Sequence, residues 1–284
     1  MIPQNLHMHS TWDDGKSTVE EMILASRDAG LASVGVSVHC PMPFENDWEC
    51  PVERLPDYRA EVRALADKYA GSIKVYLGIE WDVSAAALDL SPYDYVIGSV
   101  HELPVDGHRS VDANAETTAR FLAECFGGDA DAAAEMYFAE MDKVAARPEV
   151  GIVGHFDLLT KFDEQRGFFH ENSPRYRRAA ERAMEKLVAA GKIFEVNTGA
   201  ISRGYRTTPY PSAQWLRLLR EMGGRVTVSA DAHHKSGVTC AFDLAERMVR
   251  EAGFTEIWVL EGKKFVPVSL DCSPSNRHEN KSLT

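Results

Sequence analysis

The sequence predicts an α/β protein in which parallel strands alternate with helices. Apolar, β-branched segments alternate with helix-like segments about seven times along the 284 residues. The strand-like segments are nearly continuous apolar runs, which is typical of parallel strands that are covered on both faces. These patterns indicate a doubly wound sheet or a barrel, and 284 residues is an ordinary length for a single barrel domain.

Seven segments are expected to form the strands. The first is the short run "NLHMH" near the N-terminus, and the others are residues 31–40, 72–82, 94–101, 149–157, 191–199 and 224–234. No Gly-x-Gly-x-x-Gly pattern follows the first strand, so a dinucleotide-binding fold has no support.

Helices are expected in the intervals between these strands. Residues 17–30 begin with a capping-box pattern formed by Ser17 and Glu20. Residues 52–71 have helical spacing, with Pro56 setting a late start. The remaining helices are expected in 115–147, as a pair broken at "FGGDAD", and in 174–190, 211–223 and 238–252.

The composition narrows the classes of partner. The net charge of −12 disfavours nucleic-acid binding, and it requires local cations wherever a phosphate substrate binds. No apolar run is long enough for a transmembrane helix, and no secretory signal is visible, so no membrane partner is expected. Five cysteines, an odd number, do not suggest a disulfide framework and indicate a reducing, cytoplasmic location. The sequence gives no oligomeric state.

Six of the ten histidines fall at the C-terminal end of a predicted strand, and two carboxylates share this position. The histidines are His7, His9, His39, His101, His155 and His233, and the carboxylates are Glu80 and Asp231. In a parallel barrel the strand C-termini open on one face, so these residues would converge in one pocket. The joint pattern predicts a metal site.

Imidazole and carboxylate groups suit zinc, iron and manganese alike. Eight or nine such ligands exceed what one ion needs, and they suit two or three divalent ions with Glu80 central enough to bridge. Clustered ions hold a bridging hydroxide at neutral pH and stabilise charge on the attacking and leaving oxygens. That is the chemistry of phosphoester hydrolysis.

At these residues the chain resembles a known family. "HMHSTWDDG" is similar to the first motif of the PHP (polymerase and histidinol phosphatase) superfamily. His39, Glu80, His101, His155 and "SADAH" (229–233) resemble its later motifs in the same order, and the resemblance extends from residue 5 to residue 269. "GHFDLLTKF" (154–162), "FEVNTGAISRGYRTTPYPS" (194–212) and a short last strand resemble the histidinol-phosphatase branch.

The resemblance implies a distorted (β/α)7 TIM-like barrel in a single domain, residues 1–270, followed by a polar tail, 271–284. It also implies three ions. The first ion would take His7, His9, Glu80 and Asp231, the second Glu80, His101 and His155, and the third Asp14, His39 and His233.

The implied activity is hydrolysis of L-histidinol phosphate to L-histidinol and phosphate, in histidine biosynthesis, through a metal-bound hydroxide. Asp14, Glu80 and His233 would be catalytic, with the leaving-group acid left open among Asp14, His233 and water. The substrate-binding candidates are Lys161, Arg203 and Arg206. One departure is "TK" (160–161), which stands where an arginine-containing pair is expected, so the sequence leaves the phosphate clamp undefined.

One loop has two possible roles, and several other polar residues are expected to have no part in the site. Loop 43–49, with Phe44, Glu45, Asp47 and Trp48, forms either an acidic rim for a cationic amino alcohol phosphate or a polar surface turn. Asp13 is expected to be a turn or helix-cap residue. His108, His170, His234 and His278 are expected on the surface.

Three other functions compete. A PHP phosphoesterase acting on nucleotides or another small phosphate ester would have nearly the same metal site. An amidohydrolase usually bridges its metals with a modified lysine, whereas this chain has Glu80 in the equivalent region. A non-catalytic PHP module usually loses ligands, whereas this chain keeps them.

Overall fold

A parallel sheet forms the centre of the protein. The computed structural model describes residues 2–271, and within them seven parallel strands pair in the order β1-β2-β3-β4-β7-β8-β9. The strands are β1 (Gln4–Asn5), β2 (Ser33–His39), β3 (Lys74–Asp82), β4 (Tyr95–Ser99), β7 (Ile152–Val153), β8 (Ile193–Asn197) and β9 (Arg225–Ser229). The expected tail, with His278, lies outside the described residues except for Asp271.

The two edges of the sheet meet just beyond β1 and β9. Met8 forms a parallel bridge with Ala232, and the His9 amide donates to the Ala232 carbonyl at 2.9 Å. The sheet therefore curls into a nearly closed barrel, and the predicted (β/α)7 fold is confirmed. The closure lies at the C-terminal ends of the strands, next to the histidines.

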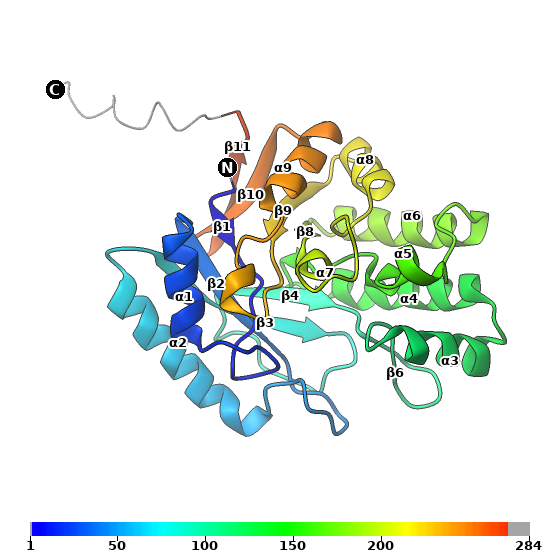
Figure 1. Cartoon of the computed structure of the whole chain (residues 1–284), viewed down its shortest axis with the longest axis horizontal. Coiled ribbons are helices and arrows are strands. Elements are labelled where there is room, and N and C mark those ends of the chain that lie inside the picture. Colours follow the sequence, from blue (N-terminus) through cyan, green and yellow to red (C-terminus); the bar gives the residue numbers. More distant parts are fainter. Residues whose placement is uncertain (1, 272–284) are drawn as a thin grey trace.

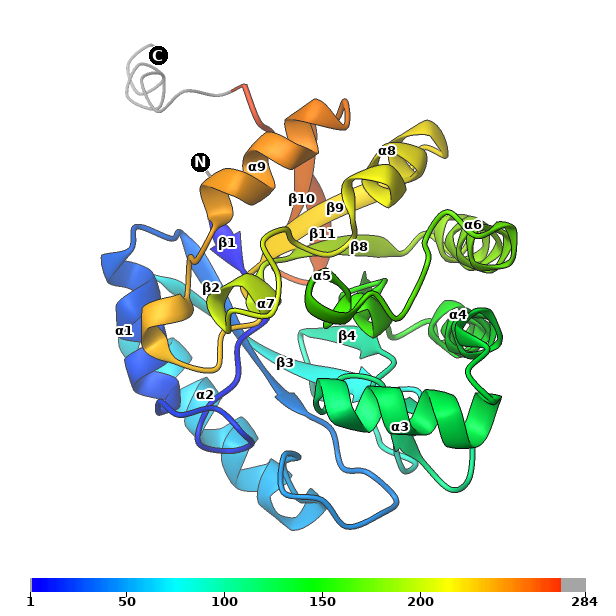
Figure 2. The same ribbon diagram turned by 45° about the vertical axis from the view of Figure 1, so that its right-hand side comes forward.

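Helices surround the barrel on the outside (Figures 1 and 2). The helices of eight or more residues are α1 (Val19–Asp28), α2 (Leu55–Tyr69), α3 (Ala115–Phe126), α4 (Ala130–Ala146), α6 (Pro174–Ala189), α8 (Ala213–Glu221) and α9 (Phe242–Glu251). Short helices α5 (Asp163–Arg166) and α7 (Gly199–Ser202) lie in the connections before and after β8. Residues 83–94 join β3 to β4 without a helix, which distorts the regular alternation. In the described part of the chain, no helix is long and apolar enough to cross a membrane.

Three local expectations need correction. The capping box of α1 is one residue later than predicted, since Thr18 Oγ1 accepts from the Glu21 amide at 3.2 Å and Glu21 caps the Thr18 amide at 3.0 Å. Strand β7 is only two residues long, because beyond it the His155 amide donates to the Glu195 carboxylate at 3.0 Å. The last strand is instead an antiparallel hairpin, β10 (Glu256–Glu261) and β11 (Lys264–Ser269).

A second hairpin, which the sequence did not predict, interrupts the connection after β4. Its strands are β5 (Glu102–Leu103) and β6 (Arg109–Ser110), with Glu102 opposite Ser110. The hairpin begins directly after His101, so it lies at the rim where the strands of the barrel end.

The barrel is apolar at its N-terminal end and polar at its C-terminal end. Its lower interior is a separate cluster of buried side chains: Leu6, Tyr76, Tyr95, Ile97, Ile152 and, from β10, Leu260. Gly35 and Gly78 make room for the Tyr95 ring, because a Cβ at either position would lie 2.2 Å from a Tyr95 side-chain atom. The Tyr95 hydroxyl donates to the Leu6 carbonyl at 2.5 Å.

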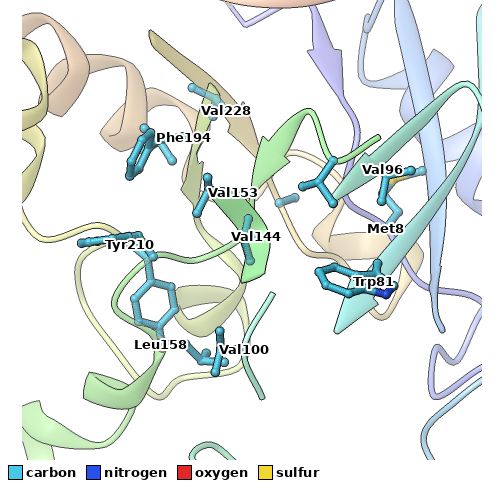
Figure 3. Close-up of a cluster of buried hydrophobic side chains, with 14 of the residues drawn as sticks. Met8, Trp81, Val96, Val100, Val144, Val153, Leu158, Phe194, Tyr210 and Val228 are labelled. Atoms are coloured by element: carbon cyan, nitrogen blue, oxygen red, sulfur yellow. The ribbon is translucent and has the colours of Figure 1, made fainter. Parts of the chain in front are cut away.

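The larger core lies between the sheet and the helices. Val153, Phe194 and Val228 from neighbouring strands belong to it, as does Val144 of α4 (Figure 3). On β3 the alternate residues Leu77 and Ile79 join this outer core, so Glu80 between Ile79 and Trp81 points to the barrel interior. Because side chains alternate along β3, the Glu80 carboxylate lies inside the barrel, on the C-terminal side of the apolar cluster around Tyr95.

Candidate metal centre

The nine predicted metal ligands all meet at the C-terminal rim of the barrel. Seven of them line a cavity of about 310 Å³: Asp14, His39, Glu80, His101, His155, Asp231 and His233. His7 and His9 are fully buried, and both ε nitrogens face the Glu80 carboxylate, at 3.2 and 3.6 Å from Oε2. Residues separated by more than 220 positions therefore share one site.

The first group of donors surrounds Glu80 Oε2 and Asp231 Oδ1. Asp231 Oδ1 lies 3.8 Å from His7 Nε2 and 3.4 Å from His9 Nε2. These are the residues that the resemblance assigns to the first ion.

The second group surrounds the other oxygen of the same carboxylate. Glu80 Oε1 lies 3.4 Å from His101 Nε2 and 3.1 Å from His155 Nε2. The two oxygens of Glu80 thus face different sets of histidines, which is the geometry of a bridging carboxylate.

The third group surrounds Asp14, in the turn after the first strand. Its Oδ1 lies 3.3 Å from His233 Nε2 and 3.8 Å from His39 Nε2. His39 also lies close to the bridge, with Nδ1 3.0 Å from Glu80 Oε2.

The donors fit divalent ions in spacing and in hydrogen bonding. Ligand atoms at about 2.0–2.1 Å from a tetrahedral zinc ion are about 3.4 Å apart, and the donor separations given above are 3.0–3.8 Å. Among the described residues, His7 Nε2, His9 Nε2 and Glu80 Oε2 are buried and have no hydrogen bond. Buried polar atoms without partners are costly, so these three are arranged for a ligand.

Carboxylates hold the outer nitrogens of three of these histidines. His7 Nδ1 lies 2.7 Å from Glu195, His9 Nδ1 lies 2.7 Å from Asp13, and His101 Nδ1 lies 3.1 Å from Asp82. A carboxylate on the far nitrogen fixes the tautomer and the orientation of the ring, and it makes the near nitrogen a stronger ligand. Asp13 also accepts from the Ser10 and His39 amides, so it stabilises the turn as well.

The electrostatics of the cluster demand positive charge. Burial alone would lower the pKa of His9, but the Asp13 carboxylate and other acids raise it to about 10. Burial likewise opposes charge on His101, yet Glu80 and Asp82 raise its pKa to about 9. Burial would raise the pKa of Glu80, but the surrounding histidines hold it well below its usual range. Divalent ions would supply this positive charge in place of protons.

The backbone around Asp231 is shaped for this contact. Asp231 has φ of 47°, in the left-handed region that few residues other than glycine occupy. A Cβ on Gly199 would lie 2.7 Å from Asp231 Oδ2, so only glycine leaves space for the carboxylate. Strain of this kind clusters at functional sites.

The rest of the cavity is formed by the β5–β6 hairpin and by connections rather than by the strands of the barrel. We call Trp48, Glu102, Asp112, Lys161 and Arg203 the loop wall. Arg203 donates to Asp231 Oδ2 at 3.2 Å and lies 3.1 Å from His233 Nδ1. Lys161 donates to the Asp112 carboxylate at 2.9 Å and to its carbonyl at 2.8 Å.

Arg206, the third predicted substrate-binding residue, is not among the residues that line the cavity. Its guanidinium donates to the Thr160 carbonyl at 3.2 Å and to the Thr160 hydroxyl, and it lies 4.5 Å from the centre of the Tyr210 ring. Burial raises the pKa of the nearby Asp157 to about 7, and the charge on Arg206 opposes this rise. The geometry therefore favours a role in holding the loops together.

Loop 43–49 contributes an aromatic residue to the cavity, but its two expected rim carboxylates lie outside it. Trp48 lines the cavity, and its ring centre is 5.0 Å from that of His39. Glu45 and Asp47 are exposed and do not line the cavity. Phe44 contacts His108 of the β5–β6 hairpin, with ring centres 4.7 Å apart.

Sequence reasoning missed four carboxylates at the site. Asp82 and Glu195 support His101 and His7, Glu102 enters the cavity from the β5–β6 hairpin, and Asp112 lines the cavity and holds Lys161. A signal existed for Glu195, which stands inside the apolar strand "IFEVN" and is fully buried. A charged residue at such a position requires a buried partner.

The TIM-like barrel carries three groups of histidine and carboxylate donors at the ends of its strands. The fold and the site together define a class of barrel proteins that are equipped to hold divalent metal ions. Residues 5–199 match the PHP domain family, and the chain belongs to this family.

Named relatives extend over nearly the whole chain. A protein of Deinococcus radiodurans named "Probable histidinol-phosphatase" is 28% identical over 260 residues, which cover 87% of this chain and 92% of the relative. The histidinol-phosphatase of Lactococcus lactis subsp. lactis is 24% identical, with 91% and 94% covered. A solved structure of the histidinol phosphate phosphatase from Lactococcus lactis, in complex with zinc, L-histidinol and phosphate, superimposes with a TM-score of 0.72 at 20% identity. It covers 93% of this chain and 98% of that one.

Proposed function

We propose that this protein is a metal-dependent phosphomonoesterase that hydrolyses L-histidinol phosphate to L-histidinol and inorganic phosphate, in the cytoplasm. The observation that carries the proposal is the convergence of all nine expected donors, Glu80 among them, at one rim of the barrel, in a chain whose relatives over nearly its whole length are named histidinol-phosphatases. The cavity of about 310 Å³ is at the lower end of the range for small-molecule pockets, which favours a small ester.

The strand-end residues would hold two or three divalent ions of zinc, iron or manganese. His7, His9 and Asp231 would share the first with Glu80, His101 and His155 the second with Glu80, and Asp14, His39 and His233 would hold a third. When bound, such ions supply a water of lowered pKa and positive charge for the phosphoryl oxygens. Glu195, Asp13 and Asp82 orient the rings, so the donors need little rearrangement.

Arg203 and Lys161 are the cations of the cavity, and they would bind the phosphoryl group. A guanidinium can grip two phosphate oxygens at once and neutralise the charge that develops in the transition state. Arg203 is well placed for this, because it already lies beside Asp231 and His233 at the edge of the donor groups. Lys161 is held by Asp112, which fixes its ammonium at the cavity wall.

The leaving alcohol oxygen needs a proton, and Asp14 and His233 are the two side chains positioned to provide it. They lie 3.3 Å apart and both line the cavity. Burial, together with the positive charges of His9 and Arg203, lowers the pKa of His233. Asp14 Oδ1 or His233 Nε2 would hold this proton only where no third ion takes these two atoms, and with a third ion bound the proton would come from water.

The test is phosphate release by the metal-loaded protein. L-Histidinol phosphate, nucleoside monophosphates and small sugar phosphates are compared, each with and without a chelator. We expect chelator-sensitive release with the highest kcat/KM for L-histidinol phosphate. A preference for a nucleotide or another ester would support the alternative PHP phosphoesterase, and no chelator-sensitive release from any ester would refute the enzymatic function.

A further inference from the structure

The β5–β6 hairpin places a carboxylate in the cavity without giving it a partner. Glu102 is only 6% exposed, and it lines the cavity. Within residues 2–271 its side chain has no hydrogen bond or ion pair, whereas the buried carboxylates of Glu80, Glu195 and Asp82 all have them. An unpaired buried carboxylate costs free energy, so its retention indicates a ligand that is not part of the chain.

The surroundings of Glu102 are acidic. Burial, together with the negative charges of Asp112 and Asp82, raises the pKa of Glu102 to about 8, and His101 opposes this rise, so a cationic ligand is what would stabilise the charged form. Both cations of the loop wall already have carboxylate partners: Lys161 is paired with Asp112, and Arg203 is paired with Asp231. Neither cation neutralises Glu102, so this part of the cavity is complementary to a positive charge on a ligand.

Two other residues that line the cavity, Ser110 and Trp48, belong to the surroundings of Glu102. Glu102 pairs with Ser110 across the hairpin, and Ser110 also lines the cavity. Trp48 lies near His101, the residue that precedes Glu102, with the two ring centres 6.1 Å apart. An aromatic face and a carboxylate therefore border one part of the cavity, which suits a cationic group with an apolar body.

We propose that Glu102 is a specificity-determining residue, which binds the positively charged amine or imidazolium group of a small phosphate ester. This inference rests on the proposed phosphatase function. The phosphoryl group lies at the strand-end donors and Arg203, and the cationic end of the alcohol reaches the hairpin. Glu102 thus does what the sequence suggested for Glu45 and Asp47, which are exposed.

The test compares a cationic and a neutral ester in Glu102→Gln, which keeps the size of the side chain and removes its charge. We expect kcat/KM for L-histidinol phosphate to fall about 10- to 100-fold, mostly through KM, because one charge-assisted contact is lost. For phenyl phosphate, which has no cation, kcat/KM should change less than about threefold. Metal content should be unchanged, and Glu124→Gln, at an exposed position of α3, is the matched control.

A binding measurement separates this inference from the proposed function. Calorimetry with L-histidinol, in the presence of inorganic phosphate, should give a Kd about 10- to 100-fold weaker for Glu102→Gln than for the parent. Equal losses for both esters, or an unchanged Kd, would overturn the role of Glu102. Failure of the parent to hydrolyse L-histidinol phosphate would overturn the proposed function, and the histidinol Kd values would still decide the inference.

Discussion

The two walls of the cavity are built differently. At the strand ends His7 and Glu80 are 0% and 1% exposed, and three carboxylates fix imidazole rings: Glu195 and Asp82 on barrel strands and Asp13 in the turn after β1. The loop wall comes from a hairpin and from connections between the elements, and its Arg203 side chain is 27% exposed, whereas Glu102 and Lys161 are 6% exposed. On the proposed function, the strand ends would hold the metal ions, whereas the loop wall would bind the phosphoryl group and the alcohol of the substrate.

The strongest test of this division is Glu80→Gln, which removes the bridging charge between the first two groups of donors. We expect the loss of at least one bound ion per chain and a fall in kcat of about 1000-fold or more, since the metal centre supplies several kcal/mol of transition-state stabilisation. Metal analysis and phosphate release measure the two effects. Glu53→Gln, at an exposed position before α2, should change neither. Full metal content with ordinary activity would show that Glu80 is not a bridge.

The loop wall should behave in the opposite way. Arg203→Ala removes the cation beside Asp231 but no metal donor, so we expect kcat/KM to fall about 100- to 1000-fold while metal content stays intact. Arg203→Lys should recover part of the loss, because a lysine keeps the charge but lacks the planar fork. Unchanged kinetics in Arg203→Ala would remove Arg203 from phosphate binding.

The strand ends were also the part that sequence could predict. A histidine after an apolar run reports a strand end, and parallel strands bring such ends together whatever their distance along the chain. The barrel and the grouping of all nine donors followed from this rule and the family resemblance. His155 was placed correctly although β7 is two residues long, because β7 still sets where the chain leaves the sheet.

The loop wall escaped prediction because its contacts depend on tertiary packing. Glu102 follows His101 directly, but its place in the cavity depends on the β5–β6 hairpin. The strands of this hairpin have only two residues each, which is too short for an alternating hydrophobic pattern to show in the sequence. Arg203 and Arg206 are three residues apart in one connection. Only the structure separates them, placing Arg203 at Asp231 and Arg206 at Thr160.

A milder change on the strand side tests whether the outer carboxylates matter. Glu195→Gln keeps an acceptor for His7 Nδ1 but removes the negative charge, and its NH2 group would face the His155 amide, which donates to Glu195 Oε2. We therefore expect about 10- to 100-fold weaker metal affinity. At saturating metal, kcat should stay within a few-fold of the parent. Activity titrated against buffered free zinc or manganese measures both quantities. Equal metal affinity in the variant and the parent would show that the interior carboxylate only packs the barrel.

The smallest effect on activity is expected at Arg206, next to the loop wall. Arg206→Ala removes a buried guanidinium that donates to Thr160 and lies beside Asp157, so the free energy of unfolding should fall by about 2–4 kcal/mol. At a temperature where the variant is fully folded, kcat/KM should stay within about threefold. Chemical denaturation and steady-state kinetics measure the two effects. A loss of kcat/KM as large as that of Arg203→Ala, with little change in stability, would instead place Arg206 on the substrate and extend the loop wall by one more cation.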